Sequence, residues 1–223
     1  MTFSLIARDD DGSFGAVIAS SSPAVSARCL WLRDNVGAVA TQNVTDPRLG
    51  QKGLDLLAEG SDAEAAAASL AGQANAAFRQ VLIVGKEGRA AVHSGARSLG
   101  TVSSAVDGGV AAAGNLLANS HVPLAMVASF KFAKGCFEER LLIALRAGLN
   151  AGGEAGPIHS AGLAVVSGTG WRITDLRVDW NDKPVQELAD ILAVWLPQRD
   201  DYVTRALDPA RSPGFGVAGD DRR

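Results

Sequence analysis

Apolar and polar residues alternate along the start of the chain. One face of an extended segment takes the apolar side chains and the other takes mostly polar ones: Phe3, Leu5 and Ala7 against Thr2, Ser4, Ile6 and Arg8. A period of two residues is typical of a half-buried β-strand. Asp11-Gly12 then predicts a hairpin, because a two-residue type I′ turn needs positive φ at both positions. We therefore expect strands over residues 2–10 and 13–20, with Thr2 opposite about Ser21.

A second hairpin is predicted from residue 28 to residue 41. One strand covers 28–33 and the other 36–41, and Asp34-Asn35 forms the loop between them. The short link after the second strand starts this hairpin near Thr2, and its return strand brings Gln42 and Asn43 back to the same edge. Asp46-Pro47 follows as the N-cap and first residue of a helix. Several early elements are thus expected to meet at Thr2.

The rest of the chain alternates between blocks of helices and blocks of strands. Periodicity and capping signals predict helices over 47–59, 61–76, 123–133, 137–150 and 184–207, and strands over 80–85, 89–94, 110–114, 160–167 and 171–178. Blocks of strands argue against a doubly wound parallel sheet, in which strands and helices alternate strictly. We predict an α+β chain, a four-layer αββα sandwich of antiparallel sheets. Residues 1–208 form a single domain, residues 209–223 form a poorly ordered tail, and Pro197 is a kink site in the last helix.

Composition and charge narrow the classes of function. Of the 223 residues, 47% are hydrophobic and 20% charged, and the formal net charge is −3. A chain with this net charge shows no basic cluster that would bind nucleic acid or an anionic membrane. No signal peptide and no apolar run of membrane-spanning length is visible. We expect a cytoplasmic protein that binds neither nucleic acid nor membrane.

Metal and cofactor motifs do not stand out in the chain. His93, His121 and His159 are widely spaced, and Cys29 and Cys136 form no paired motif. Neither a GxxxxGK[ST] loop nor a GxSxG elbow occurs. The sequence therefore predicts no metal and no cofactor.

The chemistry of interest lies in the second residue. A small residue after the initiator methionine normally allows removal of Met1, so the mature chain would begin with Thr2. Its α-amine has an ordinary pKa of about 7.7–8.0 and is partly neutral near pH 7. That amine can take the proton of the Thr2 hydroxyl as the hydroxyl attacks a carbonyl. Met-Thr also opens many proteins that make no such use of it, so the surroundings of Thr2 decide.

Several longer stretches carry a family resemblance. They are residues 1–8, 37–42, 53–57, 79–81, 93–95, 114–117, 139–142 and 175–179. With these motifs the chain resembles domain-of-unknown-function family 1028, a bacterial family placed with the N-terminal-nucleophile hydrolases, over about residues 2–190. The resemblance implies an αββα fold and amide-bond hydrolysis at Thr2. Together with the convergence at the sheet edge, it gives Ser20, Ser22, Gln42, Asn43 and Asn115 as oxyanion or substrate-binding residues.

Two functions of different class remain open. The first is an amidohydrolase that cleaves an amide-type C–N bond of a small molecule through Thr2. The alternative is a non-catalytic ligand-binding or assembly module on the same fold. In either case we expect a homo-oligomer, most simply a dimer, because closed two-fold assemblies are common and sheet edges need covering. Leu141-Leu142 and Leu192, Val194 and Trp195 form either contact faces or core.

Overall fold

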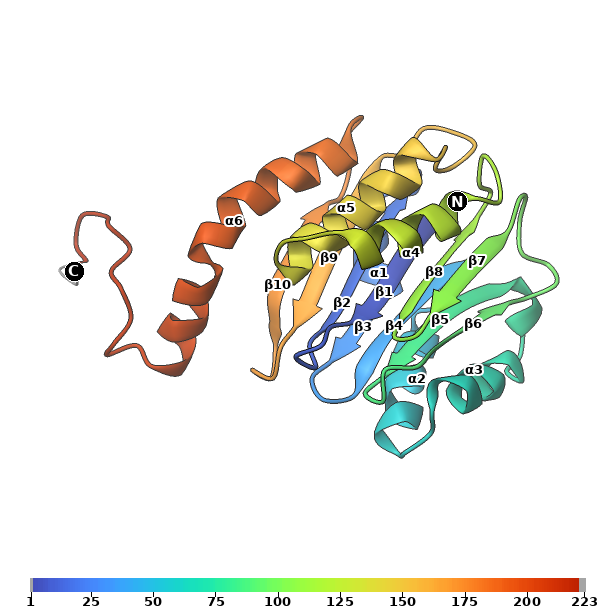
Figure 1. Ribbon diagram of the computed structural model, residues 1–223, viewed down its shortest axis with the longest axis horizontal. Helices are drawn as coiled ribbons and strands as arrows, with labels where there is room; N and C mark the ends of the chain where they lie inside the picture. The colour runs from blue at the N-terminus through green and yellow to red at the C-terminus, as the bar shows by residue number, and fades with distance from the viewer. Residues whose placement is uncertain (1, 221–223) are drawn as a thin grey trace.

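The computed structural model describes residues 2–220, and Met1, whose removal the sequence predicts, lies outside them. In this part of the chain two antiparallel sheets pack together with helices (Figure 1). The larger sheet has the order β10-β9-β2-β1-β8-β7: Arg172–Val178, Ser160–Val166, Phe14–Ser20, Thr2–Arg8, Val110–Asn115 and Ser103–Asp107. The smaller sheet has the order β3-β4-β5-β6: Leu30–Arg33, Gly37–Asn43, Arg79–Gly85 and Ala90–Ser94. The prediction of a mixed α+β chain with antiparallel sheets is confirmed.

Strand β1 lies inside the larger sheet, between β2 and β8. Its side chains alternate between two apolar cores, so both faces of β1 are buried rather than the one face that the sequence predicts. Phe3, Leu5 and Ala7 face helices α4 (Val122–Phe132), α5 (Phe137–Asn150) and α6 (Pro184–Leu207). Ile6 faces the opposite way, into the apolar cluster shared with the smaller sheet. Thr2 and Ser4 share the parity of Ile6, so their side chains belong to the space between the sheets.

The other face of the smaller sheet is covered by two helices. These are α2 (Arg48–Ala58) and α3 (Ala63–Ala71), and their Leu and Ala side chains pack on Val39, Val81 and Ile83. Helix α3 ends earlier than the predicted residue 76, and the 3₁₀ turn η1 (Ala76–Phe78) leads into β5. The N-cap of α3 is Asp62, whose carboxylate accepts a hydrogen bond from the Ala65 N–H. The helix thus begins at Ala63, two residues after the predicted start at residue 61.

Three local predictions are wrong. The loop between β1 and β2 spans three residues, because the Asp9 N–H bonds to the Ser13 carbonyl, and Thr2 therefore lies opposite Ser20 rather than Ser21. The predicted strand from residue 28 begins instead as the short helix α1 (Val25–Cys29). Strand β7 was not expected. It is a mostly exposed edge strand with little hydrophobic signal.

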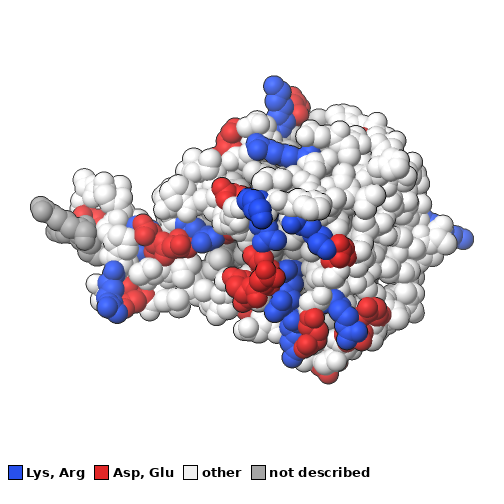
Figure 2. Space-filling model, in the orientation of Figure 1, with Lys and Arg blue, Asp and Glu red and all other residues white. Residues whose placement is uncertain are grey.

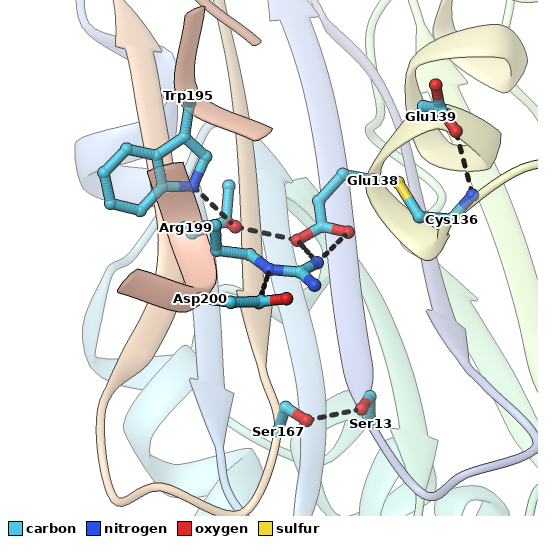
Figure 3. A network of polar contacts seen from close by, with 9 residues as sticks. Ser13, Cys136, Glu138, Glu139, Ser167, Trp195, Arg199 and Asp200 are labelled. Atoms are coloured by element: carbon cyan, nitrogen blue, oxygen red, sulfur yellow. Dashed lines mark hydrogen bonds and ion pairs between the residues drawn. The ribbon is translucent and has the colours of Figure 1, made fainter. Parts of the chain in front are cut away.

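Helix α6 is fastened to the body by a buried ion pair. Arg199 donates to both carboxylate oxygens of Glu138 on α5, at 2.8 and 2.9 Å (Figure 3). Thr174 of β10 also donates to Glu138, and the Trp195 indole N–H donates to the Thr174 hydroxyl. Helix α6 contains Pro197, and beyond a bend it extends away from the sheets (Figure 1). Arg205 near its end donates to the carbonyls of residues 213 and 214 in the tail.

Charged side chains of both signs are intermixed on the face drawn in Figure 2. Among the charged side chains of the protein, Arg177 pairs with Asp179. Within residues 2–220, no helix has both the length and the apolar character needed to cross a bilayer.

Candidate functional site

Thr2 lies at the end of the larger sheet with its side chain largely buried, 5% exposed. Its hydroxyl oxygen is 3.3 Å from the hydroxyl oxygen of Ser20, the residue opposite it on β2. Ser20 is itself fixed, because its Oγ accepts a hydrogen bond from the Ser22 backbone N–H at 3.1 Å. The structure thus brings Thr2, Ser20 and the backbone of Ser22 together, as the sequence predicts for these three residues.

Asn115 lies on the other side of Thr2, as its partner on β8. The Asn115 amide nitrogen donates to Gln80 Oε1 at 3.1 Å. Its Oδ1 is buried, and among residues 2–220 it has no hydrogen-bond partner. Leaving a buried acceptor unpaired typically costs about 1–3 kcal/mol, so such an atom in a native structure calls for an explanation. Because Asn115 is paired with Thr2 at the start of β1, an amine there is a candidate donor to this oxygen.

A buried amide network supports this end of the site from the smaller sheet. Gln42 accepts from the Ser4 hydroxyl at 2.7 Å and donates to Gln80 Oε1 at 2.8 Å. Gln80 in turn donates to the Ser94 hydroxyl and to the Gly114 carbonyl. Gln42 therefore bonds to Ser4, two residues along β1 from Thr2, and acts on the site through Gln80 and Asn115. The sequence analysis missed Gln80, although its place on a predicted strand beside Gln42 could have indicated it.

Asn43 serves a different purpose from the one expected. Its backbone has a positive φ of 73°, and its amide nitrogen donates to the Phe78 carbonyl at 2.6 Å. Its Oδ1 accepts from the Leu99 N–H at 3.2 Å. The two ends of this side chain thus bond to the 3₁₀ turn η1 before β5 and to the loop after β6, and neither bonds to Thr2 or Ser20.

Glu154 is a second residue at this edge that the sequence does not indicate. It is 5% exposed and follows Gly152-Gly153, which the sequence marks only as a loop. Its Oε1 accepts from the Ser21 N–H at 3.0 Å, and Oε2 is buried with no hydrogen-bond partner among the described residues. Burial raises the pKa of Glu154 from its ordinary value of 4.5 to about 7. A carboxyl group whose pKa is shifted this far, at the edge of a pocket, marks a candidate functional position.

A pocket of about 540 Å³ opens beside Glu154. Its apolar wall comes from the end of α5, the loop before β9 and the start of α6: Leu149, Pro157, Ile158, Pro184 and Val185. The polar residues in its wall are Glu154, Asp182, Lys183 and Gln186. A volume of this size is in the range of sites for small molecules.

Other nucleophiles and ligand sets have less support. Burial raises the pKa of both Cys29 and Cys136 to about 11, so neither thiol is a ready thiolate. His93 contacts the Ala76 carbonyl, and His159 stacks on Trp180 with Nδ1 3.6 Å from Asp182. Across the described 2–220 range, no three His, Cys, Asp or Glu side chains gather in a metal-binding group.

Comparisons with known proteins point to one family. Residues 2–188 match the model described as a family of unknown function, DUF1028. The chain is similar to the crystal structure of protein SPO2555 from Silicibacter pomeroyi, described with the same family, at 27% identity and a TM-score of 0.84, over 92% of this chain and 94% of that chain. Anbu (ancestral beta-subunit) from Yersinia bercovieri is more distant, at 11% identity and a TM-score of 0.42, over 88% of this chain and 97% of that chain. None of the curated proteins compared with the chain matches it.

Proposed function

The chain belongs to the family of unknown function DUF1028, and from its site geometry we propose that it is an amidohydrolase with Thr2 as nucleophile. The observation that carries the proposal is the pairing of the Thr2 hydroxyl with the fixed Ser20 hydroxyl at 3.3 Å, at the very start of an internal strand. Once Met1 is removed, the same residue holds both a hydroxyl and a free α-amine. Nucleophile and base are then joined by two carbon atoms.

In the proposed reaction the Thr2 amine is the general base. It takes the proton from Oγ1 as Oγ1 attacks the substrate carbonyl, and it later returns this proton to the leaving amine. Asn115 Oδ1, the unpaired acceptor beside Thr2, receives a hydrogen bond from the amine and directs its lone pair toward Oγ1. The acyl group stays on Oγ1 as an ester until water, activated by the same amine, releases it.

The Ser20 hydroxyl supplies electrostatic stabilisation in this proposal. Its oxygen accepts from the Ser22 N–H, and its hydroxyl lies 3.3 Å from Thr2 Oγ1, from where it would donate toward the reacting oxygen atoms in the transition state. The second hydrogen of the Asn115 amide is a further donor, since the first goes to Gln80. Each preorganised donor of this kind is typically worth about 3–4 kcal/mol in the transition state. Gln42 contributes indirectly, by fixing Gln80.

The order of sheets and helices supports a fold proposal that accompanies this activity. Helices α4 to α6 pack on one face of the larger sheet, the sheets share an apolar cluster, and α2 and α3 pack on the far face of the smaller sheet. We take this order as the four-layer αββα sandwich of N-terminal-nucleophile hydrolases. In that arrangement a nucleophile at a strand end between the two sheets is open to substrate only at the sheet edge.

The first test is the mass of the intact protein purified from its native host. The proposal requires a chain that begins at Thr2, and a chain that keeps Met1 contradicts it, because the α-amine would then be on the wrong residue. The processed chain is next incubated with a small apolar α′,β′-epoxyketone. This probe forms a stable ring only with a hydroxyl and an amine on the same residue, so the expected product is one adduct, mapped to Thr2.

Variants separate the enzyme from a binding module on the same fold. Thr2→Ser keeps both groups and should form the adduct, whereas Thr2→Ala should form none. Hydrolysis of a panel of small apolar anilides should follow the same pattern. If Thr2→Ala turns over the panel as well as the wild type, Thr2 is not the nucleophile. If neither chain reacts with the probe or the panel, the non-catalytic alternative is favoured.

A further inference from the structure

Glu154 occupies the place toward which β1 would continue beyond its first residue. Strands β2 and β8 flank β1, and the chain runs past Thr2 on both sides, to Ser21 after β2 and to Leu117 after β8. The Glu154 carboxylate accepts from the Ser21 N–H, and its backbone forms an isolated antiparallel bridge with Leu117. Glu154 therefore contacts both of the segments that follow the strands flanking β1.

The strand register puts this carboxylate close to the N-terminal amine. Thr2 lies level with Ser20 and with Asn115, so Ser21 is one residue beyond that level and Leu117 is two residues beyond. Both contacts of Glu154 therefore lie just beyond the level of Thr2, at the end of the sheet where β1 begins. This is the direction in which the backbone nitrogen of the first residue points.

The carboxylate also has a free acceptor for that amine. Oε1 is used by Ser21, whereas Oε2 is buried and has no hydrogen-bond partner among residues 2–220. A buried carboxylate oxygen without a donor is unfavourable unless a positively charged or hydrogen-bonding group joins it. Other charged side chains of the adjacent pocket wall are Asp182 and Lys183, and Asp182 is directed to His159 and is 93% exposed.

We infer that Glu154 is the positioning residue for the N-terminal amine: its carboxylate orients the amine and stabilises the ammonium that forms when Thr2 attacks. The inference rests on the proposed function of Thr2. The proton moves from Oγ1 to the amine nitrogen, the new positive charge is balanced by the Glu154 carboxylate, and the proton leaves with the amine product. Glu154 itself takes no proton, as the aspartate of a Ser-His-Asp triad takes none. Hydroxyl, amine and carboxylate thus form a three-member relay from β1 and the loop before β9.

The test measures the pKa of the N-terminal amine directly. A chain processed to begin at Thr2 is labelled at its α-amine with ¹³C-methyl groups, and the methyl resonance is followed by NMR as a function of pH. An opposite charge nearby favours the charged amine, so Glu154→Gln should lower its pKa by about one unit or more. Glu154→Asp keeps the charge and should recover part of the shift. Asp182→Asn, on the exposed side of the same pocket, should leave the amine close to the wild-type value.

The outcomes for the inference and for the function can be told apart. An unchanged amine pKa in a folded Glu154→Gln chain overturns the inference, even if Thr2 still reacts with the epoxyketone. A lowered pKa in a chain that never reacts supports the Glu154–amine pair and contradicts the hydrolase. If Glu154→Gln does not fold, Glu154→Asp provides the decision, because its shorter side chain places the carboxylate farther from the amine and should also lower the amine pKa. A wild-type amine pKa in that folded variant overturns the inference.

Discussion

The Thr2 hydroxyl on β1 lies 3.3 Å from the Ser20 hydroxyl on β2, and the Ser22 N–H holds Ser20 in place. This contact joins the start of one strand to the end of its neighbour. Both side chains belong to the space between the sheets and are almost fully buried. A hydroxyl pair of this kind gives Thr2 a fixed direction before any substrate arrives.

Ser20→Ala should slow the reaction of Thr2 with the epoxyketone by about 100-fold, because one preorganised donor is lost. The measurement is the rate of adduct formation by intact mass, at a probe concentration well below saturation. The stability of the variant should change little, since alanine fits the space and the Ser22 N–H lies at a half-exposed turn.

Ser13→Ala is the matched control for this variant. Ser13 precedes the opposite end of β2, is 6% exposed, and pairs with the Ser167 hydroxyl at 3.0 Å (Figure 3). It should react at the wild-type rate. Equal rates for Ser20→Ala and Ser13→Ala would remove Ser20 from the proposed site.

Arg199→Met should lower the free energy of unfolding by about 3 kcal/mol or more, because it leaves the Glu138 carboxylate buried without its cation. The Glu138 side chain is only 1% exposed, and the Thr174 hydroxyl alone would then hold it. Urea unfolding followed by tryptophan fluorescence reports the loss, since Trp195 belongs to the same network.

Arg177→Met tests whether burial is the reason. Arg177 pairs with Asp179 at 2.9 Å, but both side chains are more than 40% exposed, at 43% and 49%. Exposed pairs of this kind are typically worth about 0–1 kcal/mol. If Arg177→Met lowers the free energy of unfolding as much as Arg199→Met does, the burial of the Arg199–Glu138 pair is not the reason for its effect.

The sequence predicts the elements of this chain better than their register. Alternation in residues 2–8 identifies both faces of β1, because a period of two follows from strand geometry alone. Turn length is less readable: the loop after β1 has one residue more than Asp11-Gly12 implies, and Thr2 shifts from Ser21 to Ser20. Helix α1 depends on distant partners, since Ala24 adopts a φ of 49° while its N–H bonds to the carbonyl of Asp179.

Some residues of the candidate site can be predicted from the strand pattern, and others cannot. Thr2, Ser20 and Asn115 lie at the ends of well-patterned strands, so their convergence follows from antiparallel pairing. Asn43 ends its strand with a positive φ, and this turns its side chain toward Phe78. Glu154 acts on Ser21 from 133 residues away in sequence, and nothing near it in the chain indicates that partner.

A homodimer remains our prediction for the state in solution. Of the two apolar faces considered, Leu141, Leu142 and Leu192 are core residues, whereas Val194 on α6 is 66% exposed. Light scattering at micromolar concentration should give twice the 22.9 kDa of one chain. Val194→Asp should weaken the dimer if α6 provides the contact. A wild-type mass of one chain contradicts the prediction.

The stability of the protein should depend on pH through Glu154. Well below its ordinary pKa of 4.5 the group is neutral in both the folded and the unfolded chain, so its burial then carries no charge penalty. In the folded chain burial raises the pKa of Glu154 to about 7. As the pH rises from the ordinary value through about 7, only the unfolded chain ionises at first, and the folded state loses stability.

Glu154→Gln removes this loss, because the amide is neutral at every pH. At about pH 8 the variant should be more stable than the wild type by at most about 3 kcal/mol, and the difference should vanish near pH 4. Urea unfolding at a series of pH values measures it, with Asp182→Asn as the exposed control. A difference that does not change between these pH values would mean that Glu154 ionises normally in the folded chain. A carboxylate that costs stability at neutral pH beside Thr2 is what a residue kept for chemistry rather than for folding would show.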